Sequence, residues 1–326
     1  MITTSKMHRS HGIIFWLAMS ACAPVHAQTF PTKSIRFVGI ATPGTSSDVI
    51  GRTIGEPLAR QLGHPVVVEN RGGAGGTIAA GIVHRSESDG HTLLLTASAQ
   101  PGMVWLYQNL PFHPINDFSG VASLAELPSV LVVPAQRNWT SLKDMIAAAK
   151  TKPGALNFGS GGTGSGTHLH SEKLMIGAGI TAGHVPFKGT SEVLVELVAG
   201  RLDWIYMPAA TVVPMIKEGR LRGLIVSSKT RVTQLPDVPT AAELGLPDGE
   251  HTFWIGLLAP RKTPRAVINK LHDEIQRTLK LPEVRERYRQ LGAEVFSLKP
   301  EAFDAFLTED TAAMGRIVKA AKIKPQ

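Results

Sequence analysis

Short apolar runs recur along the chain, and stretches with helical periodicity separate most of them. The runs are bounded by Gly, Pro or Asn and cover residues 34–40, 65–68, 91–96, 131–133, 155–158, 184–187, 204–206 and 221–227. Helical spacing is clearest where apolar side chains recur every fourth residue, at Ile50, Ile54, Leu58 and Leu62. Strands that alternate with helices predict an α/β protein whose parallel sheet is covered on both faces.

The alternation occurs about twice, once before Ala125 and once after it, which predicts two doubly wound lobes. A further strand at 252–258 and two amphipathic helices, the last over 300–323, follow the second repeat without forming a lobe of their own. We therefore infer that the chain crosses back, so that a hinge joins the lobes and a ligand cleft lies between them. The predicted domains are lobe 1 over 28–128 and 253–326, and lobe 2 over 129–252.

The first 27 residues have the features of a secretory signal. Lys6 and Arg9 precede an apolar stretch at 12–19, and small residues precede Gln28. This pattern predicts a cleavable signal peptide over 1–27; the alternative is a lipoprotein acylated at Cys22, the only cysteine. Cleavage before Gln28 leaves a mature chain without cysteine, which excludes disulfides, thiolate metal sites and a cysteine nucleophile.

The charge of the chain favours anionic ligands without indicating nucleic acid. Its formal net charge is +8 at pH 7, but the basic residues are spread out and are not interleaved with aromatic side chains. His168 and His170 stand two apart with no carboxylate cluster beside them. We therefore predict no bound metal, no cofactor and no nucleic-acid partner.

Two loops, residues 42–48 and 159–168, share a design. Each is rich in glycine and hydroxyl groups, follows a predicted strand and precedes a predicted helix. Backbone N–H groups and the positive end of the helix face a ligand bound at such a loop, and ligands of open parallel sheets bind at the carboxyl ends of strands. The pair predicts a cleft that holds an anion from both lobes, unless the glycines serve turn geometry alone.

The second loop also contains GSGGTG, which satisfies a dinucleotide-binding pattern. The acidic residue that a dinucleotide site needs is missing from the sequence. Such sites need a carboxylate roughly 20 residues further on, where residues 184–189 offer none. Neither Ser160 nor Ser165 has the flanking glycines of a nucleophile elbow. We predict that the protein is not an enzyme; the alternative is an exported hydrolase that uses a loop serine with His168.

Several motifs occur in an order that resembles the Bug family, the periplasmic receptors of tripartite tricarboxylate transporters. They are Pro43-Gly44 with Asp48, PVVVENRGGAGG at 65–76, DGHTLL at 89–94, HVPFKGT at 184–190 and LPDVPTAAELGLP at 235–247. The resemblance implies a monomeric, periplasmic-binding-protein-like fold of type II. It also implies a periplasmic location, a small carboxylate ligand and delivery to integral membrane permease subunits; a ligand-sensing receptor for a signalling partner is the alternative.

The resemblance also implies the ligand-binding residues. In the first loop they are Thr42, Pro43, Gly44, Thr45 and Ser46, with Asp48 fixing the loop. In the second loop they are Ser160, Gly161, Gly162, Thr163, Gly164, Ser165 and Thr167, with His168 behind them. The cleft edge adds Ser98, Lys188, Gly189, Thr190 and Met207. Because many family members carry an acidic residue where this chain has Met207, we predict a carboxylate ligand without a positive amine, whose body can be apolar or aromatic.

Overall fold

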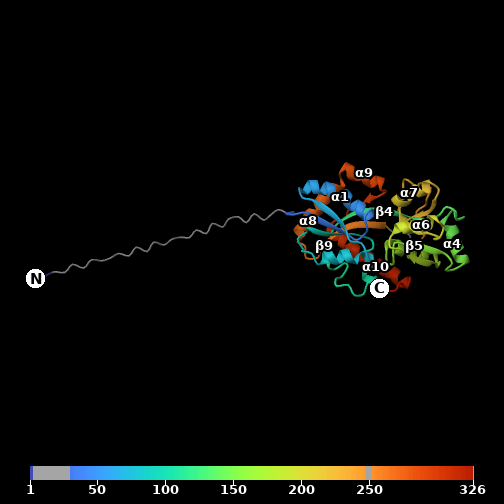
Figure 1. Cartoon of the computed structure of the whole chain (residues 1–326), viewed down its shortest axis with the longest axis horizontal. Coiled ribbons are helices and arrows are strands. Elements are labelled where there is room, and N and C mark those ends of the chain that lie inside the picture. Colours follow the sequence, from blue (N-terminus) through green and yellow to red (C-terminus); the bar gives the residue numbers. More distant parts are fainter. Residues whose placement is uncertain (3–29, 247–251, 326) are drawn as a thin grey trace. The chain divides into compact units, whose positions relative to one another are not determined.

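The computed structural model describes residues 1–2, 30–246 and 252–325 of the chain (Figure 1). The chain divides into two units, Met1–Phe30 and Pro31–Gln326, and the fold below belongs to the second. Residues 3–29, which hold most of the predicted signal peptide and Cys22, lie outside the described residues. Within the described ranges, no helix has both the length and the apolar character needed to cross a membrane.

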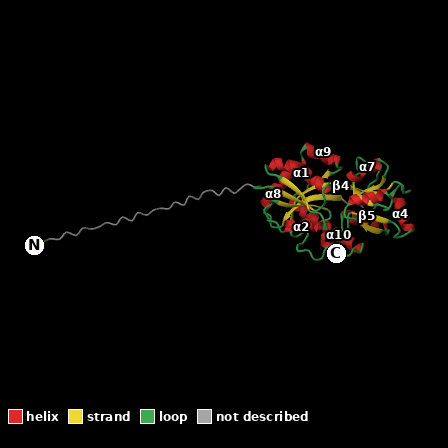
Figure 2. Cartoon of the chain, viewed as in Figure 1, coloured by secondary structure: helices red, strands yellow, loops and turns green. Residues whose placement is uncertain are grey.

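Strands and helices alternate through most of the described chain, as the sequence predicts (Figure 2). The strands are β1 (Ile35–Gly39), β2 (Val66–Asn70), β3 (Thr92–Ala97), β4 (Phe118–Pro134), β5 (Asn157–Ser160), β6 (Gly183–Pro186), β7 (Ile205–Pro208), β8 (Leu221–Val226), β9 (Thr252–Pro260) and β10 (Glu294–Val295). The helices are α1 (Ser46–Leu62), η1 (Ala74–Gly76), α2 (Thr77–His84), α3 (Met103–Leu106), α4 (Leu142–Thr151), α5 (Gly166–Ala178), α6 (Thr190–Val198), α7 (Ala209–Lys217), α8 (Arg265–Leu279), α9 (Pro282–Gln290) and α10 (Pro300–Ala320).

The main sheet has the order β10-β4-β9-β3-β1-β2, with β7 and β8 paired to another part of β4. β1 pairs in parallel with β2 and β3, and β5 pairs in parallel with β6 in a separate small sheet. β9, in contrast, is antiparallel to both β3 and β4. The main sheet is therefore mixed, and the predicted parallel pairing holds for β1 with its neighbours β2 and β3. The chain leaves this sheet along β4 and returns along β9, so the two strands run in opposite directions.

β4 belongs to two groups of strands in succession. Residues 118–128 pair with β9, whereas residues 129–134 pair with β7 and β8. Figure 1 shows β4 between the label of β9 on one side and that of β5 on the other. The apolar pattern indicated only residues 131–133 as a strand, because Ser, Gly, Glu and Pro interrupt residues 118–130. Pairing with β9 brings those interrupted residues into the same strand.

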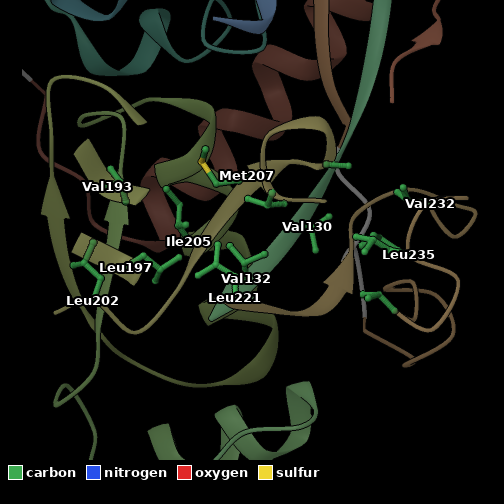
Figure 3. Close-up of a cluster of buried hydrophobic side chains, with 14 residues drawn as sticks. Val130, Val132, Val193, Leu197, Leu202, Ile205, Met207, Leu221, Val232 and Leu235 are labelled. Carbon is green, nitrogen blue, oxygen red and sulfur yellow. The ribbon is translucent and has the colours of Figure 1, made fainter. Parts of the chain in front are cut away.

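The second group of strands is buried on both faces. Val130 and Val132 of β4 lie in one apolar cluster with Ile205, Val193 and Val212 (Figure 3). The alternate residues Leu131 and Val133 lie in another cluster with side chains of α4 and α5. Successive strand residues point to opposite faces, so both faces need helices to cover them. This arrangement confirms the predicted α/β class.

Removing buried volume from this second group should destabilise the protein. Ile205 is 0% exposed, so Ile205→Ala should lower the free energy of unfolding by about 2–5 kcal/mol through lost burial and a residual cavity. The matched control Ile176→Ala changes a side chain that is 47% exposed and should shift stability by less than about 1 kcal/mol. Urea unfolding followed by circular dichroism measures both, and equal losses would contradict the proposed role of Ile205 in the core.

Candidate functional site

The carboxyl ends of β1 and β3 lie at one edge of the main sheet, because the two strands are parallel neighbours. The first loop follows β1, and Ser98 follows β3. The first residue of α5 lies against this edge: a Cβ built on Gly166 would be 3.2 Å from Ser98 Oγ and 3.5 Å from the Phe253 ring. The N-terminal end of α5, which follows the second loop, therefore lies at the edge of the main sheet where β1 and β3 end.

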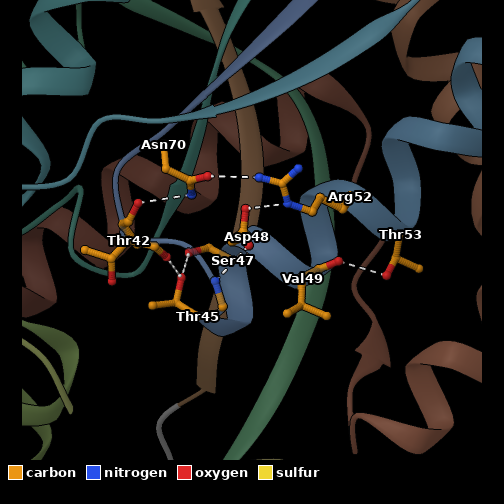
Figure 4. Close-up of polar contacts among 10 residues, drawn as sticks. Thr42, Thr45, Ser47, Asp48, Val49, Arg52, Thr53 and Asn70 are labelled. Carbon is orange, nitrogen blue, oxygen red and sulfur yellow. Dashed lines mark hydrogen bonds and ion pairs between the residues drawn. The ribbon is translucent and has the colours of Figure 1, made fainter. Parts of the chain in front are cut away.

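Asp48 organises the first loop from inside α1 (Figure 4). Its carboxylate accepts the Gly44 N–H at 2.8 Å and the Arg52 Nε–H at 2.9 Å, and the residue is only 5% exposed. Thr45 Oγ1 donates to the Thr42 carbonyl at 2.8 Å. Gly44 has a φ of +81°, a conformation that glycine adopts without strain. The Asp48 carboxylate thus forms a hydrogen bond with the loop backbone and an ion pair with Arg52.

The start of α1 leaves backbone donors without protein acceptors. The side chain of the capping residue Thr45 accepts no backbone N–H of the helix, although its Oγ1 lies 3.4 Å from Ser47 Oγ. The N–H groups of Ser46 and Ser47 have no hydrogen-bond acceptor among the described residues. At the start of α5, the N–H groups of Gly166 and Thr167 are likewise without an acceptor in the described chain. Free N–H groups at a helix start, together with the helix dipole, attract an anion.

The hydroxyl groups of the second loop mostly hold the loop itself. Ser160 is 0% exposed, and its Oγ accepts the Gly162 N–H at 3.1 Å. Thr167 Oγ1 accepts the Gly161 N–H at 3.0 Å, and Ser165 Oγ accepts the His168 N–H at 3.3 Å. Thr163 differs from these three, because no hydrogen bond of its side chain is found in the described residues. The second loop therefore offers a ligand backbone N–H groups more than hydroxyls.

A stack of rings supports the second loop from beneath. His168 and His184 lie face to face with centroids 3.8 Å apart, and Phe158 stacks between His184 and Trp204. His168 is 3% exposed, and its Nδ1 accepts the Gly164 N–H at 3.0 Å. His184 Nε2 lies 2.6 Å from Ser160 Oγ. His168 thus lies behind the loop.

His184 is a loop-supporting residue that sequence reasoning missed. It stands 24 positions from Ser160, and the only signal was its place at the start of the motif HVPFKGT. Burial, together with the nearby His168, lowers the pKa of His184 from its usual value near 6.5 to about 4. The ring is therefore neutral at pH 7, which suits its close stacking on a second imidazole.

The predicted edge residues divide into three groups. Gly189 and Thr190 lie beside the second loop, where a Cβ on Gly161 would be 3.2 Å from Thr190 Cγ2; Lys188 is exposed. Ser98 is 1% exposed, and its Oγ has no hydrogen-bond partner among the described residues. Met207 is 1% exposed inside the apolar cluster of Figure 3. Its side chain packs among apolar residues of the core, so the apolar cleft surface expected of it is not found.

Segments after β3 also approach the second loop. Leu106 of α3 lies where a Cβ on Gly164 would have to be, and Gly102 lies against Leu169 of α5. Leu106, Leu169 and three residues of α10 form one apolar cluster. Sequence reasoning did not include Leu106 or Phe253 in the site, because an apolar side chain beside a polar loop has no distinctive spacing.

The contacts do not favour the hydrolase alternative. Among the described residues the His168 side chain makes no bond to a serine hydroxyl, and Ser160, whose hydroxyl contacts the His184 ring, is 0% exposed. In the described chain, no carboxylate contacts His184 to orient it as a base, and no three His, Cys, Asp or Glu side chains gather as a metal site.

The start of α5 lies against the edge of the main sheet beside the first loop. Solved periplasmic binding proteins share this fold, which confirms the predicted two-lobed, type II fold and defines the class as solute-binding receptors. The family described as the tripartite tricarboxylate transporter family receptor matches residues 50–323. The chain belongs to this family, which confirms the resemblance found in the sequence.

Three similar proteins show how closely the chain follows the family. The BugT protein of Bordetella pertussis is 34% identical over 317 residues, which cover 95% of this chain and 97% of BugT. MatC from Rhodopseudomonas palustris, solved with bound malate, is 32% identical with a TM-score of 0.80 over 89% of this chain and all of MatC. Rpa4515 of R. palustris, solved with adipate, is 28% identical with a TM-score of 0.83 over 91% of this chain and all of Rpa4515.

Acid should lower the free energy of unfolding of the protein because of the partly buried ring of His184. Between pH 6.5 and 4 the unfolded chain protonates His184 and the folded chain does not, so stability should fall as the pH falls through this window. His184→Phe keeps a stacked ring but cannot titrate, so it should lose this part of the pH dependence. The expected difference is roughly 1 kcal/mol, because solvent screens the exposed part of the ring.

The measurement is urea unfolding of both proteins at pH 7 and pH 4.5. The quantity to compare is the pH-dependent change in unfolding free energy of each protein. Burial raises the pKa of Asp310 to about 6, so protonation of Asp310 stabilises both proteins as the pH falls, and this contribution cancels in the difference. If acid destabilises the two proteins equally, the ring stack is not the titrating element.

Proposed function

We propose that this chain is a periplasmic receptor that captures a small carboxylate between its lobes and delivers it to the permease subunits of a tripartite tricarboxylate-type transporter. The observation that carries the proposal is the set of unbonded N–H groups at the starts of α1 and α5. Carboxylate oxygens are suitable acceptors for such groups. The malate and adipate bound to the two R. palustris relatives support a carboxylate as the ligand class.

The charges around the loops favour a ligand without an ammonium group. Asp48 already accepts the Gly44 N–H and the Arg52 side chain. Glu172 lies 3.4 Å from His168 on the buried side of the second loop. Asp48 is already paired and Glu172 faces the buried His168, so neither carboxylate is placed to meet a ligand amine, and burying an ammonium here would leave its charge uncompensated. This argument stands without Met207, which lies in the core.

We retain the domain division at 28–128 with 253–326, and 129–252. The change of β4 partners at Ser129 and the start of β9 at Thr252 support these boundaries. Closure of the two lobes is then a shift of population toward the state that binds the carboxylate better.

The protein acts as a monomer and does not transform its ligand. It is exported by the signal peptide predicted over residues 1–27.

A ligand panel tests the charge requirement. Malate and adipate should raise the melting temperature more than aspartate and 2-aminoadipate, which carry an ammonium group. A ligand at 100 times its dissociation constant should add about 2.7 kcal/mol to the unfolding free energy. Thermal-shift measurements over mono- and dicarboxylates provide the comparison. An amino acid that stabilises more than its amine-free partner would contradict the charge argument, and no shift with any carboxylate would contradict the function.

Ser98 provides a test of the site itself. Its buried hydroxyl has no protein partner among the described residues, so Ser98→Ala should leave stability nearly unchanged and weaken carboxylate binding about tenfold. Ser227→Ala is the matched control, because Ser227 Oγ accepts the Ser129 N–H at 3.0 Å and is equally buried. That control should lose stability and keep its affinity. Calorimetric titration with the best carboxylate of the panel measures affinity; an unchanged dissociation constant for Ser98→Ala would remove Ser98 from the site.

A further inference from the structure

A second cavity lies apart from both loops, where β4 changes partners. It has a volume of about 430 Å³, and none of its lining residues belongs to the first or second loop. One wall is formed by Ser228 and residues 230–234, which follow β8. The other is formed by residues of α9 and of the segment up to Val295, and Pro128 of β4 completes the lining. We call this cavity the hinge groove.

The two walls of the hinge groove belong to different lobes of the proposed division. Pro128 is the last β4 residue that pairs with β9, and Ser129 is the first that pairs with β7. The Ser227 N–H donates to the Ser129 carbonyl at 2.8 Å, which fixes the start of one wall to the far part of β4. The opposite wall is tied to the near part, because Val295 pairs with Ala125. A molecule in the groove would therefore touch both lobes.

The groove is lined by more positive than negative charge. Three arginines, Arg231, Arg285 and Arg289, line it together with one carboxylate, Glu294. Arg231 is held by Glu243 at 3.0 Å, and Arg289 is held by Glu286 at 2.7 Å.

Arg285 is the arginine of the groove that lacks an acidic partner. No ion pair or side-chain hydrogen bond of Arg285 is found in the part of the chain that the structure describes. Thr230, Thr233 and Gln234 add neutral polar groups on the facing wall. An unpaired guanidinium that faces hydroxyl and amide groups across a cavity matches the planar, multidentate recognition of oxyanions.

We propose that the hinge groove is a second anion site, separate from the carboxylate cleft, with Arg285 as its principal ligand. Its occupant is a small multivalent oxyanion, such as inorganic phosphate or a polycarboxylate, and the volume accommodates either. The site itself does not depend on the proposed function. If the proposed lobe closure holds, an anion that contacts both walls couples to the hinge, and it changes carboxylate affinity by the same factor by which the carboxylate changes anion affinity.

Calorimetric titration of the mature chain at low ionic strength, first with inorganic phosphate and then with citrate, tests the site. Arg285→Gln should weaken binding of the anion about tenfold or more, because it removes the charged donor. The matched control Arg316→Gln removes one positive charge from an exposed position of α10 and should leave binding unchanged. Both positions are exposed, so neither variant should disturb folding.

A variant that removes a negative charge from the groove provides a second test, because its expected effect on binding is opposite. Glu294→Gln removes the carboxylate of the groove and should tighten phosphate binding, whereas Glu309→Gln, on exposed α10, should not. If Arg285→Gln binds phosphate as the unchanged protein does, the anion lies elsewhere and the proposal is wrong. Absence of binding by both phosphate and citrate at millimolar concentration would also overturn it. Either failure leaves the carboxylate and Ser98 tests of the proposed function unaffected.

Discussion

The structure depends on one strand that satisfies two sets of hydrogen bonds. β4 pairs with β9 along its first part and with β7 and β8 along its second, so the two groups of strands share a continuous backbone. A buried backbone must find a partner for each N–H and C=O group, and β4 finds its partners in both lobes. The return of the chain along β9 follows from the same constraint and makes the main sheet mixed. The boundary that we propose between the lobes lies where β4 changes partners, at Pro128 and Ser129.

The chemistry of the candidate site comes from backbone groups rather than from side chains. Ser160, Ser165 and Thr167 use their hydroxyls to shape the second loop, and Asp48 uses its carboxylate to shape the first. This internal bonding holds the loop backbone in place before a ligand arrives, which lowers the entropy that binding must overcome. The N–H groups at the starts of α1 and α5 have no acceptor among the described residues, and they are the groups that we propose bind the ligand. A site of this kind recognises the charge and shape of a carboxylate without needing a charged side chain that touches it.

Side chains beneath the second loop hold it through specific ring contacts. The stack of His168, His184, Phe158 and Trp204 fills the space under the second loop and holds the two imidazole rings face to face. The groove with Arg285 lies where β4 changes partners, between walls that are tied to the two parts of β4.

The sequence by itself determined the α/β class, the alternation of strands and helices, the family and the position of both glycine-rich loops. These follow from local rules, since apolar spacing reports a buried face and glycine beside hydroxyls reports a tight turn before a helix. It did not determine the extent of β4, whose residues 118–130 look irregular until β9 lies beside them. Nor could it show that Met207 lies in the core, that His184 contacts Ser160 or that Ser98 has no protein partner. Only the tertiary structure decided these points, because burial and hydrogen bonding between residues distant along the chain depend on which strands become neighbours.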